Sequence, residues 1–108
     1  MGYGFICNHR KNDEETVFYT ECQYSYQPIF REAFGIEISK MSGKVTKGKI
    51  LVFKEGLNNL KSNKDVYSQQ VTNFIGNLSN RNYDGVIDDF ETIIKLMEEQ
   101  KVGYISIA

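Results

Sequence analysis

The spacing of apolar residues changes along this chain, and that change constrains the fold more than any other feature. Near both ends, in residues 3–9 and 104–107, apolar side chains alternate with polar ones. Between these ends they recur at three- and four-residue intervals, most regularly at Phe90, Ile93, Ile94 and Met97. A period of two is typical of a half-buried strand, and a period of about 3.6 is typical of an amphipathic helix. The chain is therefore expected to combine a sheet with packed helices.

The N-terminal segment is predicted to form a β-hairpin. Residues 3–9 and 16–26 alternate as strands, and the polar residues 10–15 between them supply a turn. The second strand places four side chains on one face: Phe18, Cys22, Tyr24 and Tyr26. That face can stack on the aromatic side of the first strand, which includes Cys7, so both cysteines are expected to face the core.

Two short elements and a turn are expected after the hairpin. Pro28 suits the first turn of a helix, and Gly35 suits its end. Residues 36–39 alternate like a third strand. Ser42 and Gly43 are typical of the turn that follows it.

Two longer helices are predicted in the middle of the chain. Residues 47–61 carry apolar side chains at helical spacing, although a strand over residues 49–53 is an alternative. Asp65 can cap the next helix. The inward stripe of that helix is expected to comprise Tyr67, Val71, Phe74 and Leu78.

The most regular helix is predicted last, over residues 86–101, after a loop over residues 79–85 and before a stop at Gly103. Residues 104–107 then form a terminal strand. At 108 residues, with 41% hydrophobic and 25% charged side chains, the chain suffices for one core. The predicted fold class is α+β: a single domain, residues 1–108, with a small, mostly antiparallel sheet formed by the N-terminal hairpin and the C-terminal strand, and three to four helices packed on it.

Composition indicates a cytoplasmic protein with no membrane association. The N-terminus lacks the basic start and long apolar run of a signal peptide, and no stretch approaches the roughly 20 apolar residues of a membrane helix. The two cysteines, Cys7 and Cys22, fit a reducing compartment. A disulfide between them stays an alternative, because the sequence does not tell whether their strands bring them close together.

Charge is strongly segregated along the chain. Seven lysines and one acid, Glu55, fall between Lys40 and Lys64, which gives this segment a formal charge of +6. Residues 1–39 sum to −3 and residues 65–108 sum to −4, so the net charge of −1 conceals the pattern. Such segregation suggests a surface that selects or orients a macromolecular partner.

The run from Gly43 to Lys49 nearly matches a phosphate-binding loop. The pattern requires Ser or Thr next, to ligate magnesium, and the chain has Ile50 there. The acidic partner expected on a second strand has one candidate, Asp88, which is predicted on a helix instead. We therefore interpret the run as a lysine-rich turn that opens a helix.

No metal site, cofactor or catalytic centre is predicted. Cys7, His9 and Cys22 offer three ligands, whereas a structural zinc site usually takes four from closely spaced pairs. Cys7 and His9 lie two residues apart on one strand, so their side chains seldom meet. As the sole histidine, His9 also limits general-base chemistry. The chain is therefore expected not to be an enzyme.

An acidic row is the leading candidate for partner binding. Asp84, Asp88 and Glu91 recur at four- and three-residue spacing with Asp89 beside them, and Tyr83 precedes them. Such a row can imitate phosphates and occupy a basic groove of a protein partner such as a nuclease. The alternative is a solvated helix face whose acids complement the helix dipole.

The lysines offer an alternative basic surface for nucleic acid. Lys44, Lys47 and Lys49 flank a turn. Three tyrosines are available to stack on bases or to anchor a protein: Tyr19, Tyr24 and Tyr26. The sequence pI of about 5.8 is low for a nucleic-acid-binding domain, so nucleic acid ranks below protein as a partner.

Two segments resemble parts of small bacterial immunity proteins that accompany polymorphic or contact-dependent toxins. The first is FYTECQYSYQPIFREAF, from Phe18 to Phe34, and the second is the acidic helix that leads into GYISI, from Gly103. The resemblance implies a cytoplasmic, non-enzymatic inhibitor that neutralises a cognate toxin by direct binding. A small nucleic-acid-binding or regulatory protein and a phage-encoded inhibitor of a host defence protein are the alternatives. The oligomeric state stays open.

Overall fold

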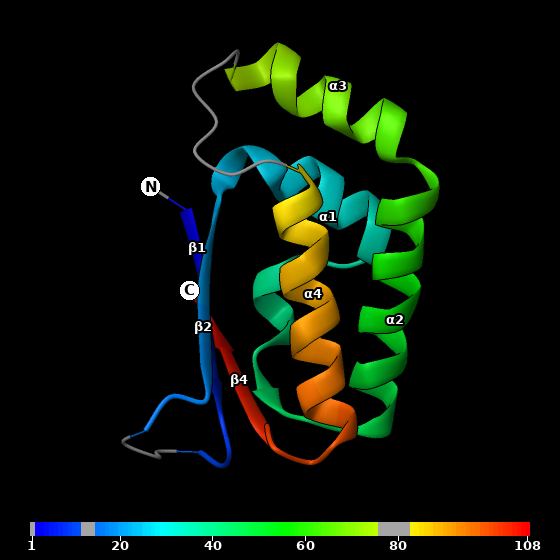
Figure 1. Cartoon of the computed structure of the whole chain (residues 1–108). Coiled ribbons are helices and arrows are strands. Elements are labelled where there is room, and N and C mark those ends of the chain that lie inside the picture. Colours follow the sequence, from blue (N-terminus) through cyan, green and yellow to red (C-terminus); the bar gives the residue numbers. More distant parts are fainter. Residues whose placement is uncertain (1, 12–14, 76–82) are drawn as a thin grey trace.

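An antiparallel sheet forms one side of the molecule in the computed structural model (Figure 1). The structure describes residues 2–11, 15–75 and 83–108, with the backbone alone at residues 25 and 71–75. The strands of its described part are β1 (Gly2–Asn8), β2 (Phe18–Gln23), β3 (Gly43–Lys44) and β4 (Tyr104–Ile107), and their spatial order is β2-β1-β4-β3. The predicted α+β class is confirmed.

β1 and β2 form the predicted hairpin, in a register that separates the two cysteines. Cys7 pairs with Phe18 and Cys22 with Tyr3. Both cysteines are buried, as expected for core-facing side chains. They lie four register positions apart, or about 13 Å along the strands, which is too far for a disulfide.

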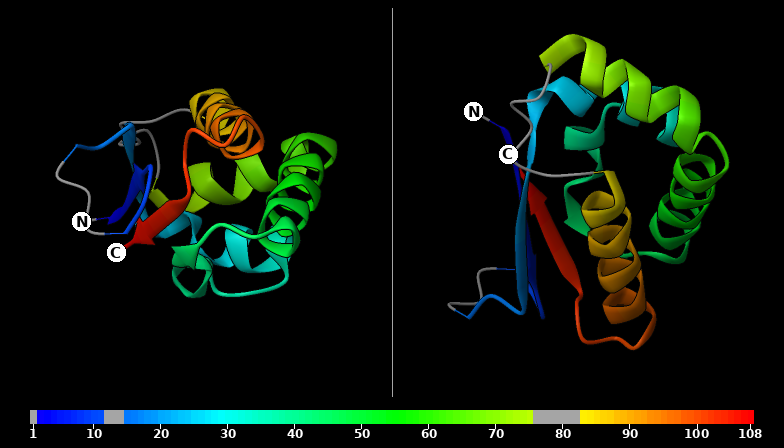
Figure 2. Two further views of the ribbon diagram at one scale, coloured as in Figure 1. Left: turned by 90° about the horizontal axis from the view of Figure 1, so that it is seen from below. Right: turned by 45° about the horizontal axis from the view of Figure 1, so that its top comes forward.

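Four α-helices are described: α1 (Gln27–Phe34), α2 (Lys47–Ser62), α3 (Lys64–Ile75) and α4 (Tyr83–Glu98). α1 and α4 lie side by side against one face of the sheet, and α2 covers them from the far side (Figure 2). α3 crosses the end of this stack (Figure 1). No helix in the described ranges is both long and apolar enough to cross a membrane.

The aromatic ring of Phe90 lies at the centre of the core. Its centroid is 5.6 Å from that of Phe5 on β1, and 5.5 Å and 5.1 Å from those of Phe30 and Phe34 on α1. The ring of Phe53 on α2 lies 6.0 Å away on the far side. These side chains are buried, so one hydrophobic core joins the sheet to both helical layers.

The predicted strand over residues 36–39 is wrong. The backbone there turns into a 3₁₀-helix, η2 (Ile38–Met41). Its two apolar side chains, Ile38 and Met41, are three residues apart and both buried. A 3₁₀-helix eclipses side chains at that spacing, so burial of this pair prevails over the short alternation that suggested a strand.

The turn predicted at Ser42 and Gly43 is also wrong, because Gly43 and Lys44 form β3 and pair with Ile105 and Tyr104. Gly43 has a φ of 128°, which favours glycine. The Ser42 hydroxyl donates to the Ile107 carbonyl and accepts from the Ile107 amide, at 3.2 Å and 2.8 Å. These bonds extend the attachment of this segment to β4.

The second predicted strand ends early, because Tyr24–Tyr26 form a second 3₁₀-helix, η1. Tyr26 is buried as predicted, whereas Tyr24 is 46% exposed. Phe18 is partly buried, and Thr20 joins Cys22 among the buried side chains of this strand.

The two middle helices form where they were predicted. α2 confirms the helix over residues 47–61 and excludes the alternative strand there. α3 begins one residue before Asp65, so this acid lies inside the first turn instead of capping it. Of the predicted stripe, Tyr67 is buried. Val71, Phe74 and Leu78 lie outside the described side chains.

α4 is shifted toward the N-terminus relative to the prediction. It begins at Tyr83, inside the predicted loop, of which residues 79–82 lie outside the described residues. It ends at Glu98, and Gln100 then takes a φ of 62°. Its predicted inward stripe is confirmed, since all four of its members are buried: Phe90, Ile93, Ile94 and Met97. Tyr104–Ile107 then forms the predicted terminal strand.

Candidate functional site

The lysine-rich turn forms a capped helix start. Two residues, Val45 and Thr46, separate β3 from α2, and the Thr46 hydroxyl accepts the Lys49 amide hydrogen at 3.1 Å. The Lys49 side chain folds back over Gly43, with its Nζ 3.5 Å from where a Cβ would stand, and burial lowers its pKa. The Lys49 amide, which a bound phosphate would need as a hydrogen-bond donor, is therefore already bonded to Thr46, and the Lys49 side chain is half-buried.

The three side chains considered for zinc do not converge. His9 is exposed, and its Nδ1 lies 3.4 Å from the Lys101 carbonyl oxygen. Cys7 and Cys22 are buried and lie on different register positions of the hairpin. Burial raises the pKa of the Cys7 thiol to about 12, so the thiol is protonated at neutral pH. Within the described ranges, no three His, Cys, Asp or Glu side chains gather as a metal site.

Tyr83, which was predicted on the binding surface, is buried instead. Its side chain is 7% exposed, and its hydroxyl donates a 2.7 Å hydrogen bond to the Leu60 carbonyl. Burial raises its pKa. The physical reason is the earlier start of α4, which places Tyr83 one turn before Val86 on the inward stripe. A signal for this was present, because Tyr83, Val86 and Phe90 follow three- and four-residue spacing.

Two of the four acids of the row, Asp84 and Glu91, face the lysines of α3 and α2. Their side chains are 67% and 47% exposed, and they form ion pairs with cations of the same chain. Three salt bridges form: Lys64 to Asp84 at 2.7 Å, Lys61 to Glu91 at 2.7 Å and Lys54 to Glu98 at 2.8 Å. The basic segment and the acidic helix are far apart in the sequence, but in the fold they neutralise each other's charge at these three pairs.

A groove runs between α2 and α4 beneath these ion pairs. Its volume is about 330 Å³, and Leu57 and Ile94 line its apolar part. Lys54–Glu98 and Lys61–Glu91 both belong to its lining. Paired charges of both signs thus surround this groove, which makes it a poor match for a strongly basic or strongly acidic partner.

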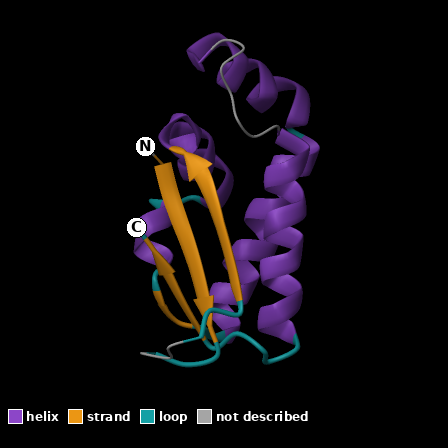
Figure 3. Cartoon of the chain, turned by 60° about the vertical axis from the view of Figure 1, so that its left-hand side comes forward, coloured by secondary structure: helices purple, strands orange, loops and turns teal. Residues whose placement is uncertain are grey.

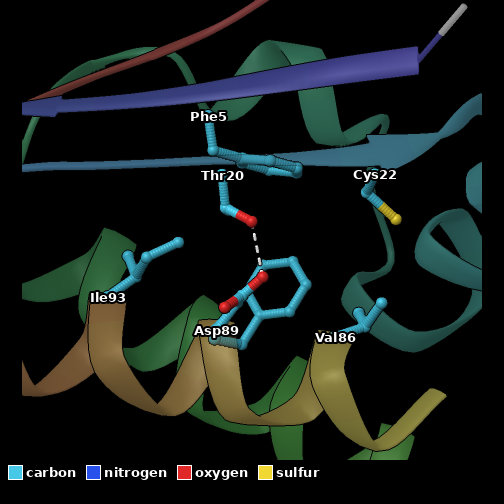
Figure 4. Close-up of a pocket in the computed structure, with 7 residues that line it drawn as sticks. Phe5, Thr20, Cys22, Val86, Asp89 and Ile93 are labelled. Atoms are coloured by element: carbon cyan, nitrogen blue, oxygen red, sulfur yellow. Dashed lines mark hydrogen bonds between the residues drawn. The ribbon is translucent and has the colours of Figure 1, made fainter. Parts of the chain in front are cut away.

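The remaining two acids, Asp88 and Asp89, differ in their surroundings. Asp89 points from α4 to β2, where the Thr20 hydroxyl donates a 2.5 Å hydrogen bond to its carboxylate (Figure 4). Phe5, Cys22 and neighbouring α4 side chains line a small cavity of about 10 Å³ beside this bond, which is about the space for one water molecule. Asp88 is exposed, and no ion pair involves it in the part of the chain that the structure describes.

No helix of the described ranges covers the second face of the sheet (Figure 3). Helices lie on the face that carries Tyr3, Phe5 and Cys7, whereas the opposite face looks away from them (Figure 3). On this open face Ile6 of β1 pairs with Tyr19 of β2. The Tyr19 side chain also covers Gly4. Its Cε2 atom and its hydroxyl oxygen each lie 3.7 Å from the position that a Cβ at residue 4 would occupy.

Two exposed side chains with apolar surface lie on this open face or just before it: Tyr19 is 52% exposed, and Val17 just before β2 is 44% exposed. Tyr24, after β2, is 46% exposed, but its ring packs edge-on at 4.9 Å against Tyr3, whose side chain lies on the helix-covered face. The Tyr19 hydroxyl donates to the Glu21 carboxylate, and this hydrogen bond raises the tyrosine pKa. Tyrosine is a frequent anchor in protein interfaces because it buries a large ring and still forms a hydrogen bond.

The sequence contained a partial signal for this surface. The alternation in residues 16–26 separates Tyr19 and Glu21 from Thr20 and Cys22, but it does not show that one face stays bare. That depends on whether helices pack on one side of the sheet or on both, which the chain order leaves open. No protein-family model, curated protein sequence or solved structure matches this chain.

Proposed function

We propose that this chain is a non-enzymatic inhibitor that binds a protein, as an immunity protein that neutralises a cognate bacterial toxin in the cytoplasm. One observation carries the proposal: the sheet face that no described helix covers bears an exposed aromatic side chain, Tyr19, with the exposed Val17 just before the same strand (Figure 3). Interfaces bury aromatic anchors at their centre, and an antiparallel sheet supports such anchors rigidly.

The charges support a protein partner over a nucleic acid. Four of the seven lysines of the segment from Lys40 to Lys64 are half-buried or paired: Lys49 lies over Gly43, and Lys54, Lys61 and Lys64 meet acids of α4. A phosphate backbone would have to replace those acids, at the cost of the intramolecular pairs. Lys44 and Lys47 remain exposed, which leaves a small basic area.

An exposed acid lies on the open face itself, since Glu21 is exposed on β2 and accepts the Tyr19 hydroxyl hydrogen. Asp88 is exposed on α4, which packs on the other face of the sheet (Figure 2). Together, Tyr19 and Glu21 give the open face an aromatic centre with an acidic neighbour. Such a surface suits a partner with a basic active-site region, as in a nuclease toxin.

The proposal is tested by affinity capture in the native host with three forms of the full chain. The first is the wild type, and the second is Tyr19→Thr, which removes the exposed ring and keeps a β-branched strand residue. The third is Leu51→Ala, which removes an apolar side chain that is 59% exposed on α2, as a matched control. Circular dichroism and thermal melting establish that all three forms fold.

We expect the wild type and Leu51→Ala to retain the same protein, and Tyr19→Thr to lose it. That protein should inhibit growth when it is expressed alone and be harmless when this chain is expressed with it. If no protein is retained by the wild type, or if Leu51→Ala loses the protein and Tyr19→Thr keeps it, the proposal is wrong.

A further inference from the structure

We propose that the outer edge of β2 pairs with an extended, lysine- or arginine-bearing strand of the partner protein. This inference rests on the proposed function, since it specifies how the protein partner would bind at the edge of the sheet next to the open face. The sheet order β2-β1-β4-β3 leaves β2 at one edge, where β1 is its one neighbour among the strands that the structure describes (Figure 3). The strand is six residues long and contains no proline, so nothing in its sequence blocks an added strand.

The hydrogen-bond phase of the sheet determines which β2 groups face outward. Gly4 and Ala108 exchange both backbone hydrogen bonds, at 2.9 Å and 3.1 Å, so the even-numbered residues of β1 bond toward β4. The odd-numbered residues, including Phe5, then bond toward β2, where Phe5 pairs with Thr20. The N–H and C=O groups of Tyr19 and Glu21 therefore point away from the sheet. These are the groups that an added strand would bond.

Acidic side chains lie on both faces beside this edge. On the open face, the exposed Glu21 belongs to the edge itself. On the helical face, Asp89 of α4 points to this edge and accepts the Thr20 hydroxyl hydrogen (Figure 4). An incoming strand, whose side chains alternate between the two faces, meets negative charge on each of them. A strand with basic residues is complementary to both.

The same acids disfavour a second copy of this chain as the occupant. A symmetric antiparallel pair centred on Glu21 places two carboxylates directly opposite each other, which is destabilising. A pair centred on Thr20 instead brings two α4 helices together, with the Asp89 carboxylate of each on the shared side. Either register places like charges together at low ionic screening, so a basic partner strand is favoured over self-pairing.

The experiment uses the full chain and two synthetic peptides. In one, lysine alternates with valine; in the matched control, glutamate replaces each lysine. Amide hydrogen exchange measured by NMR at low salt is expected to slow at Tyr19 and Glu21 with the lysine peptide. The glutamate peptide should leave these amides unchanged. An equal effect of both peptides, or none with the lysine peptide, would overturn the inference.

Two variants at one position separate the backbone contribution from the charge contribution. Glu21→Pro removes an outward N–H without removing a bond to β1, so the sheet should still form while peptide affinity falls by about tenfold or more. Glu21→Gln removes the charge alone and should weaken binding by roughly twofold to tenfold, less so at high salt. Glu55→Gln, an exposed acid on α2, is the charge-matched control and should bind normally. Undiminished binding by Glu21→Pro would contradict the inference.

The same variants distinguish failure of this inference from failure of the proposed function. If the captured partner still binds Glu21→Pro but not Tyr19→Thr, the open face binds and the edge does not. If no partner is captured but the lysine peptide protects the edge amides, strand pairing stands and the inhibitor function fails. If analytical ultracentrifugation shows a dimer and the lysine peptide does not dissociate it, the edge pairs with a second copy of this chain. That result would overturn the inference.

Discussion

Single glycine residues determine how closely the helices of this protein approach. A Cβ at Gly56 of α2 would stand 2.0 Å from the Phe34 ring of α1, a distance that no packed side chain tolerates. The α1–α2 contact therefore depends on a bare backbone at this position. Gly48, in the first turn of the same helix, meets its nearest atom, the Thr46 hydroxyl, at 3.9 Å. The two glycines thus provide an internal comparison.

Alanine at these two positions is expected to change stability in opposite directions. Gly56→Ala should lower the free energy of unfolding by about 1–3 kcal/mol, because Phe34 or the helix must move. Gly48→Ala should raise it by up to about 1 kcal/mol through helix propensity. Urea unfolding followed by circular dichroism measures both. Equal effects of the two variants would contradict the close approach at Gly56.

The buried thiol of Cys7 makes stability depend on pH in the alkaline range. Its folded-state pKa is raised to about 12, well above the value of about 8.5 of a free cysteine in an unfolded chain. The stability that its neutral form contributes is complete below about pH 8.5 and is lost as pH rises toward the folded pKa.

Between pH 8 and pH 10, the free energy of unfolding of the wild type should therefore fall more steeply than that of Cys7→Ala. The difference in slope should approach about 1.4 kcal/mol per pH unit above the unfolded pKa. Unfolding in urea under reducing conditions measures it. Rapid alkylation of native Cys7 by iodoacetamide at pH 8 would show that the thiol is not buried as described.

At the scale of elements, α2 and α4 pack together through apolar side chains, and ion pairs link the two helices on the solvent-exposed side of this contact. Leu57 and Ile94 supply apolar contact, and Lys61 with Glu91 bridges the exposed side. Half-exposed pairs of this kind contribute little individually. Their larger effect is electrostatic, because they neutralise two of the four acids of the row, Asp84 and Glu91, before a partner meets them.

A double-mutant cycle with Lys61→Met and Glu91→Gln is expected to give a coupling of about 0.2–1 kcal/mol. The coupling should fall toward zero in 1 M salt, where the Debye length is about 3 Å. A parallel cycle of Lys61→Met with Glu55→Gln, an acid on the same helix without this contact, should give none. A larger coupling in the control cycle would contradict the assignment of Lys61 to Glu91.

Elements long enough for their apolar pattern to repeat several times could be predicted from the sequence, and short elements could not. The stripe from Phe90 to Met97 repeats over several turns, so its inward face followed from the sequence alone. η2 and β3 are too short for a period to distinguish helix from strand. Their conformations depend on burial of Ile38 and on pairing with β4, which are tertiary effects.

At the scale of the whole molecule, the α+β class followed from the sequence, but the candidate site did not. The acidic row was visible in the sequence, whereas its neutralisation by Lys61 and Lys64 depends on how α2, α3 and α4 align. The open face was hidden for the same reason. A strand pattern shows two faces, and only packing shows which of them a helix covers.

The central claim is that the open face and outer edge of β2 contact a protein partner. It is tested most directly by the hydrogen-exchange footprint of the complex with the captured partner, mapped onto this chain. The account predicts slower exchange at Tyr19 and Glu21, with the solvent-facing surface of α2 around Leu51 unchanged. Slower exchange along α2 and α4, with Tyr19 and Glu21 unaffected, would contradict it.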